Sequence, residues 1–243
     1  MKQIMTYDNL RNCAYTNDRI CKKPIKGIVL SFFGLGGTEM YHEDIPTGAY
    51  YAEMGILYIV PYNNPWAWMN RQAVDYTDEI IDVLADQYKL TDDVPIISTG
   101  GSMGGQSALV YTRYAKRTPI ACVANCPVCD LVFHYGERPD LPRTLYSAFY
   151  HYDGDMEQAL KTASPLHLVP VMPKVKYHIF HCDEDKAVNI SEHSEKFVRA
   201  MKEQGHRITF DIVKGRGHCD LTEEMWQLFT QYCVDAIEKG YAG

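Results

Sequence analysis

The sequence predicts an α/β fold built on a doubly wound, mostly parallel sheet. Short apolar runs alternate with longer amphipathic segments along the 243 residues. The apolar runs are nearly continuous, which is typical of strands buried on both faces of a parallel sheet. We find no internal repeat, low-complexity tract or linker, so we expect a single domain over residues 1–243.

Six segments have the character of buried strands because apolar, β-branched and aromatic residues dominate each of them. They are GIVLSFF (27–33), GILYIVPY (55–62), VPIIST (94–99), PIACVAN (119–125), VKYHIFHC (175–182) and RITFDIV (207–213). The order in which they alternate with helical segments predicts parallel pairing.

Helices are predicted at residues 70–90, 190–205 and 221–240, where apolar positions recur at helical spacing. The second of these begins with a capping signal at Ser191 and ends at Gly205.

One long segment, residues 130–173, contains no convincing strand and is rich in aromatic residues and proline. A long excursion between two strands is usually a lid or a binding insert, so we expect a small helical lid here. A helical excursion that packs on the surface without a role is the alternative.

Charge and hydropathy exclude several function classes. The net charge of −7 argues against nucleic-acid binding, which usually requires a basic face. No run of 18 apolar residues exists, so we expect no membrane span. The apolar stretch at 27–37 begins too deep in the chain for a signal peptide, and we therefore expect a cytoplasmic protein.

The stretch STGGSMGGQSA (98–108) predicts a nucleophile. Ser102 stands between a predicted strand and a predicted helix, inside a G-x-S-x-G pattern. Glycines two positions before and after leave room for a serine in a strained turn, and the helix that follows favours developing negative charge. A Walker-type phosphate loop is excluded because Gln106, and not lysine, follows Gly105.

A nucleophilic serine needs a base and an acid that orients the base. His218 lies in a glycine-bracketed loop just before the last helix, and we assign it as the base. Asp185, in the loop after the strand at 175–182, is the preferred acid, and Asp183 is the main alternative. In folds that present a serine on this type of turn, the three residues follow one another along the chain as Ser, Asp and His, and this sequence has that order.

Acyl transfer also needs hydrogen-bond donors for the oxyanion. The first expected donor is the backbone N–H of Met103, the residue after the nucleophile. The second is expected from the glycine-rich loop FGLGGTE (33–39), with Leu35 preferred over Gly36.

Aromatic residues are candidates for the substrate site. Trp66 and Trp68 follow a strand at the catalytic edge, where they either stack on substrate or anchor the loop. Phe149 and Tyr150 in the insert are expected to line the lid. We expect a small-molecule ester or short peptide as substrate, and a reaction that requires no cofactor or metal. The oligomeric state is not readable from the sequence.

Cys122, Cys126 and Cys129 form a C-x3-C-x2-C pattern that can hold an iron–sulfur cluster. We favour packing roles, because Cys122 lies in an apolar strand and successive strand residues point to opposite faces.

These motifs together resemble the α/β-hydrolase family. GGSMGG matches its nucleophile elbow, FFGLGG its oxyanion loop, HCDEDKAV its acid loop and GRGHCDL its histidine loop. The elbow and SPLHL (164–168) are most similar to the prolyl-oligopeptidase-like and acyl-esterase branch. The resemblance covers the chain from about residue 25 and implies an α/β-hydrolase fold with a sheet of about eight strands and a Ser102–Asp185–His218 triad.

Two departures from the family pattern stand out. Cys182 occupies a position where the family often has glycine, and no β-propeller domain accompanies the hydrolase segment. We therefore expect a serine esterase for small or medium acyl groups. A prolyl-oligopeptidase-like peptidase, an aminopeptidase, an acyltransferase and a hydrolase-like protein that binds a ligand without turnover are the alternatives.

Overall fold

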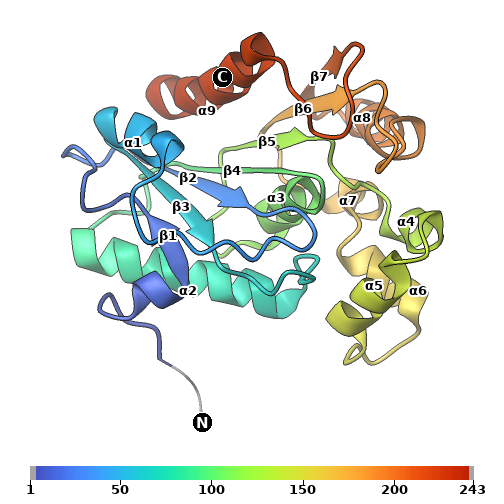
Figure 1. The fold of residues 1–243 in the computed structure, drawn as a ribbon, viewed down its shortest axis with the longest axis horizontal. Coiled ribbons are helices and arrows are strands. Elements are labelled where there is room, and N and C mark those ends of the chain that lie inside the picture. Colours follow the sequence, from blue (N-terminus) through green and yellow to red (C-terminus); the bar gives the residue numbers. More distant parts are fainter. Residues whose placement is uncertain (1–3, 241–243) are drawn as a thin grey trace.

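A computed structural model describes residues 4–240, which form a sheet between two layers of helices (Figure 1). The sheet has seven strands in the order β1-β3-β2-β4-β5-β6-β7. Their bounds are β1 (Ala14–Thr16), β2 (Gly27–Phe32), β3 (Ile56–Pro61), β4 (Ile96–Gly101), β5 (Ala121–Asn125), β6 (Lys176–Cys182) and β7 (Arg207–Val213). Strand β1 is antiparallel to β3, and all other neighbours are parallel.

The strand order places a switch point between β2 and β4. From β2 the chain moves outward to β3, then crosses back to β4 and continues in the opposite direction through β5, β6 and β7. The loops after β2 and β4 therefore diverge at the carboxyl edge of the sheet, where open α/β folds bind their ligands.

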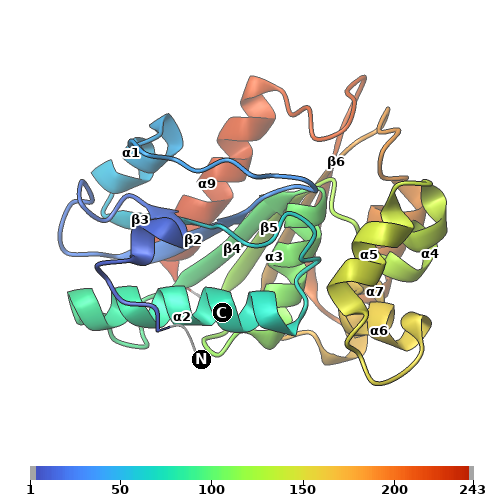
Figure 2. The same cartoon turned by 60° about the horizontal axis from the view of Figure 1, so that its bottom comes forward.

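Helices cover both faces of the sheet (Figure 2). The helices are α1 (Pro46–Glu53), α2 (Arg71–Tyr88), α3 (Met103–Tyr114), α4 (Leu131–Glu137), α5 (Leu141–Phe149), α6 (Met156–Thr162), α7 (Pro165–Leu168), α8 (Lys196–Glu203) and α9 (Glu223–Lys239). Residues of α2, α3 and α8 share one hydrophobic core with the sheet, and residues of α1 and α9 share the other. Short helical turns η1 (Leu10–Asn12), η2 (Val169–Val171) and η3 (Ser191–Glu195) complete the structure.

The predicted strands are all present, and each predicted helix has a counterpart, but several details differ. The resemblance implied about eight strands, whereas the described residues form seven. Strand β7 was expected to be buried, but it lies at the edge of the sheet and most of its residues are partly or fully exposed. The sequence patterns also missed the short strand β1 and helix α1.

The capping prediction at Ser191 is wrong. The side chain of Asn189 accepts hydrogen bonds from the backbone N–H groups of Ser191 (2.9 Å) and Glu192 (3.3 Å). A π-helical turn, η3, precedes α8 where a continuous helix was expected. Asparagine is as good a capping residue as serine, so the local signal was present two residues earlier.

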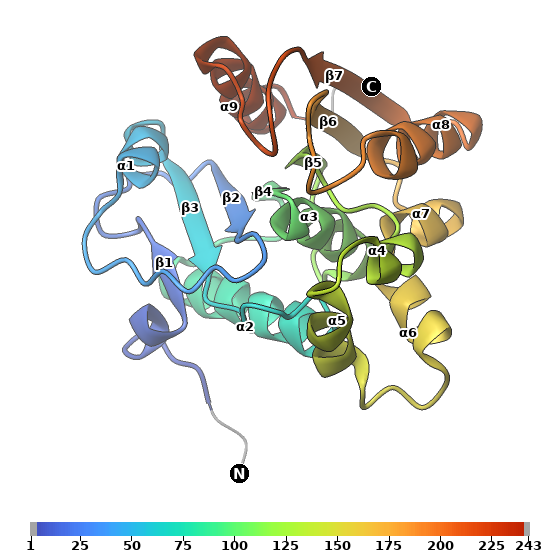
Figure 3. The ribbon, with the colours of Figure 1, turned by 45° about the vertical axis from the view of Figure 1, so that its right-hand side comes forward.

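The segment 130–173 forms α4, α5, α6, α7 and η2, which gather beside α3 (Figure 3). Insert residues such as Leu131, Leu145 and Leu160 belong to the same core as the sheet. The buried Gln106 of α3 strengthens this connection because its Nε2 donates to the carbonyl of Ala163 at 2.7 Å. Within the described residues, no helix is both long and apolar enough to span a membrane.

Candidate active site

Ser102 occupies a strained turn between β4 and α3. Its backbone has φ 58° and ψ −126°, a conformation that costs a non-glycine residue about 1–3 kcal/mol. The flanking glycines make the turn possible, because a β-carbon on Gly100 would lie 2.4 Å from the backbone of Gly104. This is the steric reason for the glycines of the G-x-S-x-G pattern.

The N-terminus of α3 lies directly against the end of β2. A β-carbon on Gly104 would lie 2.1 Å from the carbonyl oxygen of Phe32. In the loop after β2, a β-carbon on Gly34 would meet Ser102 Cβ at 3.8 Å. The loop after β2 therefore borders the serine, as an oxyanion loop requires.

The two predicted oxyanion donors on this loop are in different environments. The N–H of Gly36 donates to the carbonyl of Pro65 at 3.0 Å and is occupied. Among residues 4–240, no hydrogen bond uses the N–H of Leu35 or that of Met103, the first residue of α3. Hydrogen bonding thus favours Leu35 over Gly36 as a donor and leaves Met103 available.

Asp185 and His218 form a hydrogen-bonded pair at the ends of β6 and β7. The Nδ1 of His218 lies 2.6 Å from Oδ2 of Asp185. The other carboxylate oxygen accepts from the backbone N–H groups of Ala187 (2.8 Å) and Val188 (2.9 Å). The side chain of Asp185 is fully buried, so these bonds hold it in one orientation.

The alternative acid, Asp183, points elsewhere. Its Oδ1 accepts from the backbone N–H of Gly215 at 2.7 Å, and its Oδ2 forms an ion pair with Lys214 at 3.3 Å. The structure therefore pairs His218 with Asp185 and gives Asp183 a role in holding the loop after β7.

The hydrogen bond between Asp185 and His218 shifts the pKa of both side chains. Burial alone would raise the pKa of Asp185, but hydrogen bonds from His181 and His218 hold it well below its usual range. Burial alone would lower the pKa of His218, but the hydrogen bond to Asp185, with a smaller effect from Cys126, raises it to about 9.

Asn125, at the end of β5, joins the serine turn to the histidine loop. Its carbonyl accepts from the N–H of Ser102 at 2.9 Å, and its Nδ2 donates to the carbonyl of Cys219 at 3.2 Å. Within residues 4–240, however, no hydrogen bond joins the Ser102 hydroxyl to His218, whose Nε2 lies 3.8 Å from Cys219 Sγ. Catalytic hydrogen bonds are often long or absent before substrate binds.

The two tryptophans have different environments. Trp68 is only 1% exposed, and its indole N–H donates to Thr144 Oγ1 at 3.1 Å. It anchors the loop to the insert, so its expected contact with substrate is not available in this structure. Trp66 is partly exposed and lies under the guanidinium of Arg143, 5.1 Å from the ring centroid.

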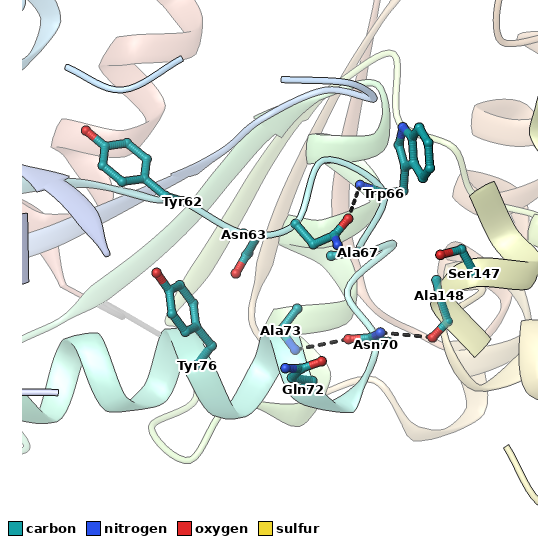
Figure 4. A pocket seen from close by; sticks show the side chains of 11 residues that line it. Tyr62, Asn63, Trp66, Ala67, Asn70, Gln72, Ala73, Tyr76, Ser147 and Ala148 are labelled. Atoms are coloured by element: carbon teal, nitrogen blue, oxygen red, sulfur yellow. Dashed lines mark hydrogen bonds between the residues drawn. The ribbon is translucent and has the colours of Figure 1, made fainter. Parts of the chain in front are cut away.

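Trp66 lines a pocket of about 240 Å³ between the loop at 62–70, the start of α2 and α5 (Figure 4). Asn70 bridges the two sides, because its Nδ2 donates to the carbonyl of Ala148 at 2.9 Å. Phe149 is buried and lines a neighbouring pocket of about 440 Å³. Tyr150 is 55% exposed and stacks on Tyr146, so it lies on the outer surface of the insert.

The C-x3-C-x2-C cysteines do not converge. Cys122 and Cys129 lie in the core shared with α3, whereas Cys126 lies in the core on the opposite face of the sheet. The pattern therefore reflects packing, as the alternation of strand side chains predicts.

Two histidines and an acid form a second cluster, at the end of α4. Glu137 Oε2 lies 2.6 Å from Nδ1 of His134 and 3.0 Å from Nε2 of His193. The Nδ1 of His193 accepts from the backbone N–H groups of Cys129 and Asp130, each at 3.1 Å, so its proton lies on Nε2 and is donated to Glu137. These hydrogen bonds give all three side chains a partner within the cluster and connect α4 to η3.

The sequence analysis missed Asn125 and Glu137. A polar residue at the end of a buried strand is the only local signal for Asn125, and the second partner of Glu137, His193, lies 56 residues away. Neither contact follows from spacing along the chain.

The family is decided by a match between residues 66–230 and the model of the prolyl oligopeptidase family. This chain belongs to that family. The matched segment contains Ser102, Asp185 and His218. No curated protein sequence matches the chain.

Solved structures confirm the α/β-hydrolase fold of this prolyl oligopeptidase family member. An acylaminoacyl peptidase of Pyrococcus horikoshii is 16% identical, with a TM-score of 0.70, and the match covers 92% of this chain and 39% of the peptidase. Est1E of Butyrivibrio proteoclasticus is also 16% identical, with a TM-score of 0.60 and coverage of 92% and 93%. Esterase 2 of Thermogutta terrifontis, phosphonylated by sarin, is 17% identical, with a TM-score of 0.60 and coverage of 88% and 84%.

Proposed function

We propose that this protein is a serine hydrolase that cleaves carboxylic esters of small or medium acyl groups. The observation that carries the proposal is the 2.6 Å hydrogen bond between Asp185 and His218, placed beside the strained turn that presents Ser102. A buried acid, an oriented imidazole and a partly exposed serine at the carboxyl edge of one sheet are the parts of a nucleophilic triad.

The proposed reaction has two steps. His218 accepts the proton of Ser102 as the hydroxyl oxygen attacks the substrate carbonyl, and Asp185 stabilises the imidazolium. The N–H groups of Met103 and Leu35 donate to the oxyanion. The imidazolium protonates the leaving alcohol, and water, activated by the same histidine, then releases the acid from the acyl-enzyme.

Trp66 is our candidate for contact with the acyl group. The hydrogen bond between Gly36 and Pro65 joins the loop of Trp66 to the oxyanion loop. The pocket of about 240 Å³ beside the ring has no triad or oxyanion residue in its lining, so the proposed acyl contact rests on the link between the two loops.

The solved esterases support the ester assignment. Est1E is matched over 93% of its length, so in that protein the matched fold makes up nearly the whole of an esterase. The family match favours a second candidate, hydrolysis of short peptides. This chain spans 39% of the length of the acylaminoacyl peptidase, so the activity of that whole protein does not transfer directly.

The test is turnover of p-nitrophenyl esters of increasing acyl length, compared with aminoacyl p-nitroanilides. We expect ester cleavage that Ser102→Ala abolishes and that Trp66→Ala weakens mainly through a higher KM for the longer acyl groups. Preferential cleavage of the anilides would favour the peptidase. Turnover that survives Ser102→Ala would exclude the nucleophile assignment.

A further inference from the structure

Two thiols lie beside the imidazole that we assign as the base. The Sγ atoms of Cys126 and Cys219 and a ring nitrogen of His218 all lie within 4.8 Å of one another. Because Nδ1 of His218 is hydrogen-bonded to Asp185, Nε2 is the free nitrogen, and it lies 3.8 Å from Cys219 Sγ. The nitrogen that would take the proton of Ser102 is thus directed at sulfur.

Two backbone N–H groups contact the sulfur of Cys126, which stays a thiol in the free protein because its hydrogen bond with Cys219 and its burial raise its pKa. Its Sγ accepts hydrogen bonds from the backbone N–H groups of Cys182 and Cys219, each at 3.4 Å. Donors directed at sulfur stabilise and tune metal-bound thiolates. The loop after β5, the last residue of β6 and the loop after β7 supply these groups, and the parallel order of the strands brings these three segments side by side (Figure 1).

The surroundings of His218 suit a metal ligand. A histidine that binds a metal usually donates its other ring N–H to a carboxylate, which fixes the tautomer and orients the ring. Asp185 accepts this bond from Nδ1 at 2.6 Å. The pair that prepares the imidazole to accept a proton therefore also prepares Nε2 to bind a cation.

A buried polar atom lies next to the cluster without a partner. The Oδ1 of Asn125 has no hydrogen bond among the described residues, although the residue is only 3% exposed. Asn125 and Cys219 line one cavity of about 200 Å³ between the sheet and α9. His218 also lines an open surface depression, together with Glu184, Lys186 and Gly217.

We propose that Cys126, Cys219 and His218 form an inhibitory site for a thiophilic divalent cation such as Zn²⁺ or Cd²⁺. Tetrahedral zinc places sulfur and nitrogen ligands about 3.6–3.8 Å apart, so the three donors need to move by about 1 Å or less. Binding displaces one proton from each thiol, and the affinity therefore rises with pH. The cation occupies Nε2, so His218 can no longer accept the proton of Ser102.

The inhibition rests on the proposed hydrolase function, whereas the binding does not. The experiment therefore measures both in the full chain, kept reduced with a phosphine. Cd²⁺ is titrated while the ultraviolet sulfur-to-cadmium charge-transfer absorption is recorded, and Zn²⁺ is titrated by calorimetry. We expect a single ion per chain, proton release, loss of ester hydrolysis in proportion to occupancy, and recovery on chelation.

Variants locate the ion. Ser102→Ala should bind Cd²⁺ as tightly as the natural protein although it is inactive, so binding is tested even if no substrate is found. Cys219→Ala should lose the charge-transfer band, and any hydrolysis it retains should resist Cd²⁺. Asp185→Asn should weaken binding about 10- to 100-fold, the usual effect of removing the partner of a metal-bound histidine.

Cys21→Ala is the matched control, because Cys21 is another buried free thiol and lies outside this cluster. It should bind and respond like the natural protein. The site assignment is wrong if a folded natural protein shows no charge-transfer band, or if Cys219→Ala keeps the band. It is also wrong if His193→Ala alone abolishes binding, because the ion would then belong to the cluster at Glu137.

Discussion

The backbone of Ser102 and the side chain of Asp185 show how single residues prepare the site. The serine is held in a left-handed conformation by its neighbours, and the acid is buried with hydrogen bonds to both oxygens. The motif identified Ser102 because the turn needs glycine at fixed positions. Choosing Asp185 over Asp183 needed the structure, because the two carboxylates lie in one short loop and only their hydrogen bonds distinguish them.

Asp185→Asn should lower kcat by about 10⁴-fold, the effect of converting the acid of a Ser-His-Asp triad to an amide. The hydrogen bond to Asp185 raises the pKa of His218 to about 9, despite burial, and only the neutral imidazole accepts a proton. The kcat/KM of the natural protein should therefore rise with pH until about 9. In the variant, the residual rate should level off at lower pH.

The matched control is Asp183→Asn, which alters a carboxylate two residues away that bonds to Gly215. It should keep the pH profile of the natural protein in steady-state assays across the same buffers. An unchanged profile in Asp185→Asn, or the larger rate loss in Asp183→Asn, would reassign the acid.

At the scale of elements, the site depends on the close contact between the end of β2 and the start of α3. Helix α3 can approach this closely only because Gly104 has no side chain. The apolar run at 27–33 predicted β2 and the strand–turn–helix pattern around Ser102 predicted α3, but Phe32 and Gly104, which make the contact, are 72 positions apart.

Gly104→Ala should reduce the free energy of unfolding by about 1–3 kcal/mol or more, because the new methyl group overlaps a backbone carbonyl that cannot rotate away. Hydrolysis should be lost with it, since α3 carries the N–H of Met103. Chemical denaturation followed by circular dichroism measures the stability.

Gly136→Ala provides the comparison, because a β-carbon there meets nothing within 4 Å and the position lies in helix α4. It should be neutral or stabilising by up to about 1 kcal/mol. Equal stability of the two alanine variants would contradict the packing argument.

At the scale of the whole molecule, the insert and the sheet share one core. Leu131, Leu145 and Leu160 of the insert pack in the cluster that contains Ile28 of β2. We therefore expect the single domain predicted over residues 1–243 to unfold in one cooperative transition, in which the insert melts together with the sheet.

Calorimetry tests this prediction, because the calorimetric and van't Hoff enthalpies should agree. Trp68 reports on the insert through its bond to Thr144, and the exposed Trp226 reports on α9. Leu145→Ala should move the whole transition, at a cost of about 2–5 kcal/mol. An early transition that changes only in Leu145→Ala would make the insert a separate unit.

The sequence by itself determined the features that depend on neighbouring residues. Strand-forming runs and the glycine-flanked turn of Ser102 act over a few positions, so their residue types are enough to predict them. The chain order Ser102, Asp185, His218 was readable for the same reason. The tertiary structure alone decided which side chains meet across the sheet. The pairing order of β2, β4, β5, β6 and β7 brings Asn125, Cys126 and Cys219 to the serine turn, and the packing of the insert buries Trp68. These contacts are non-local, and their energies depend on how whole strands and helices pack rather than on any local pattern.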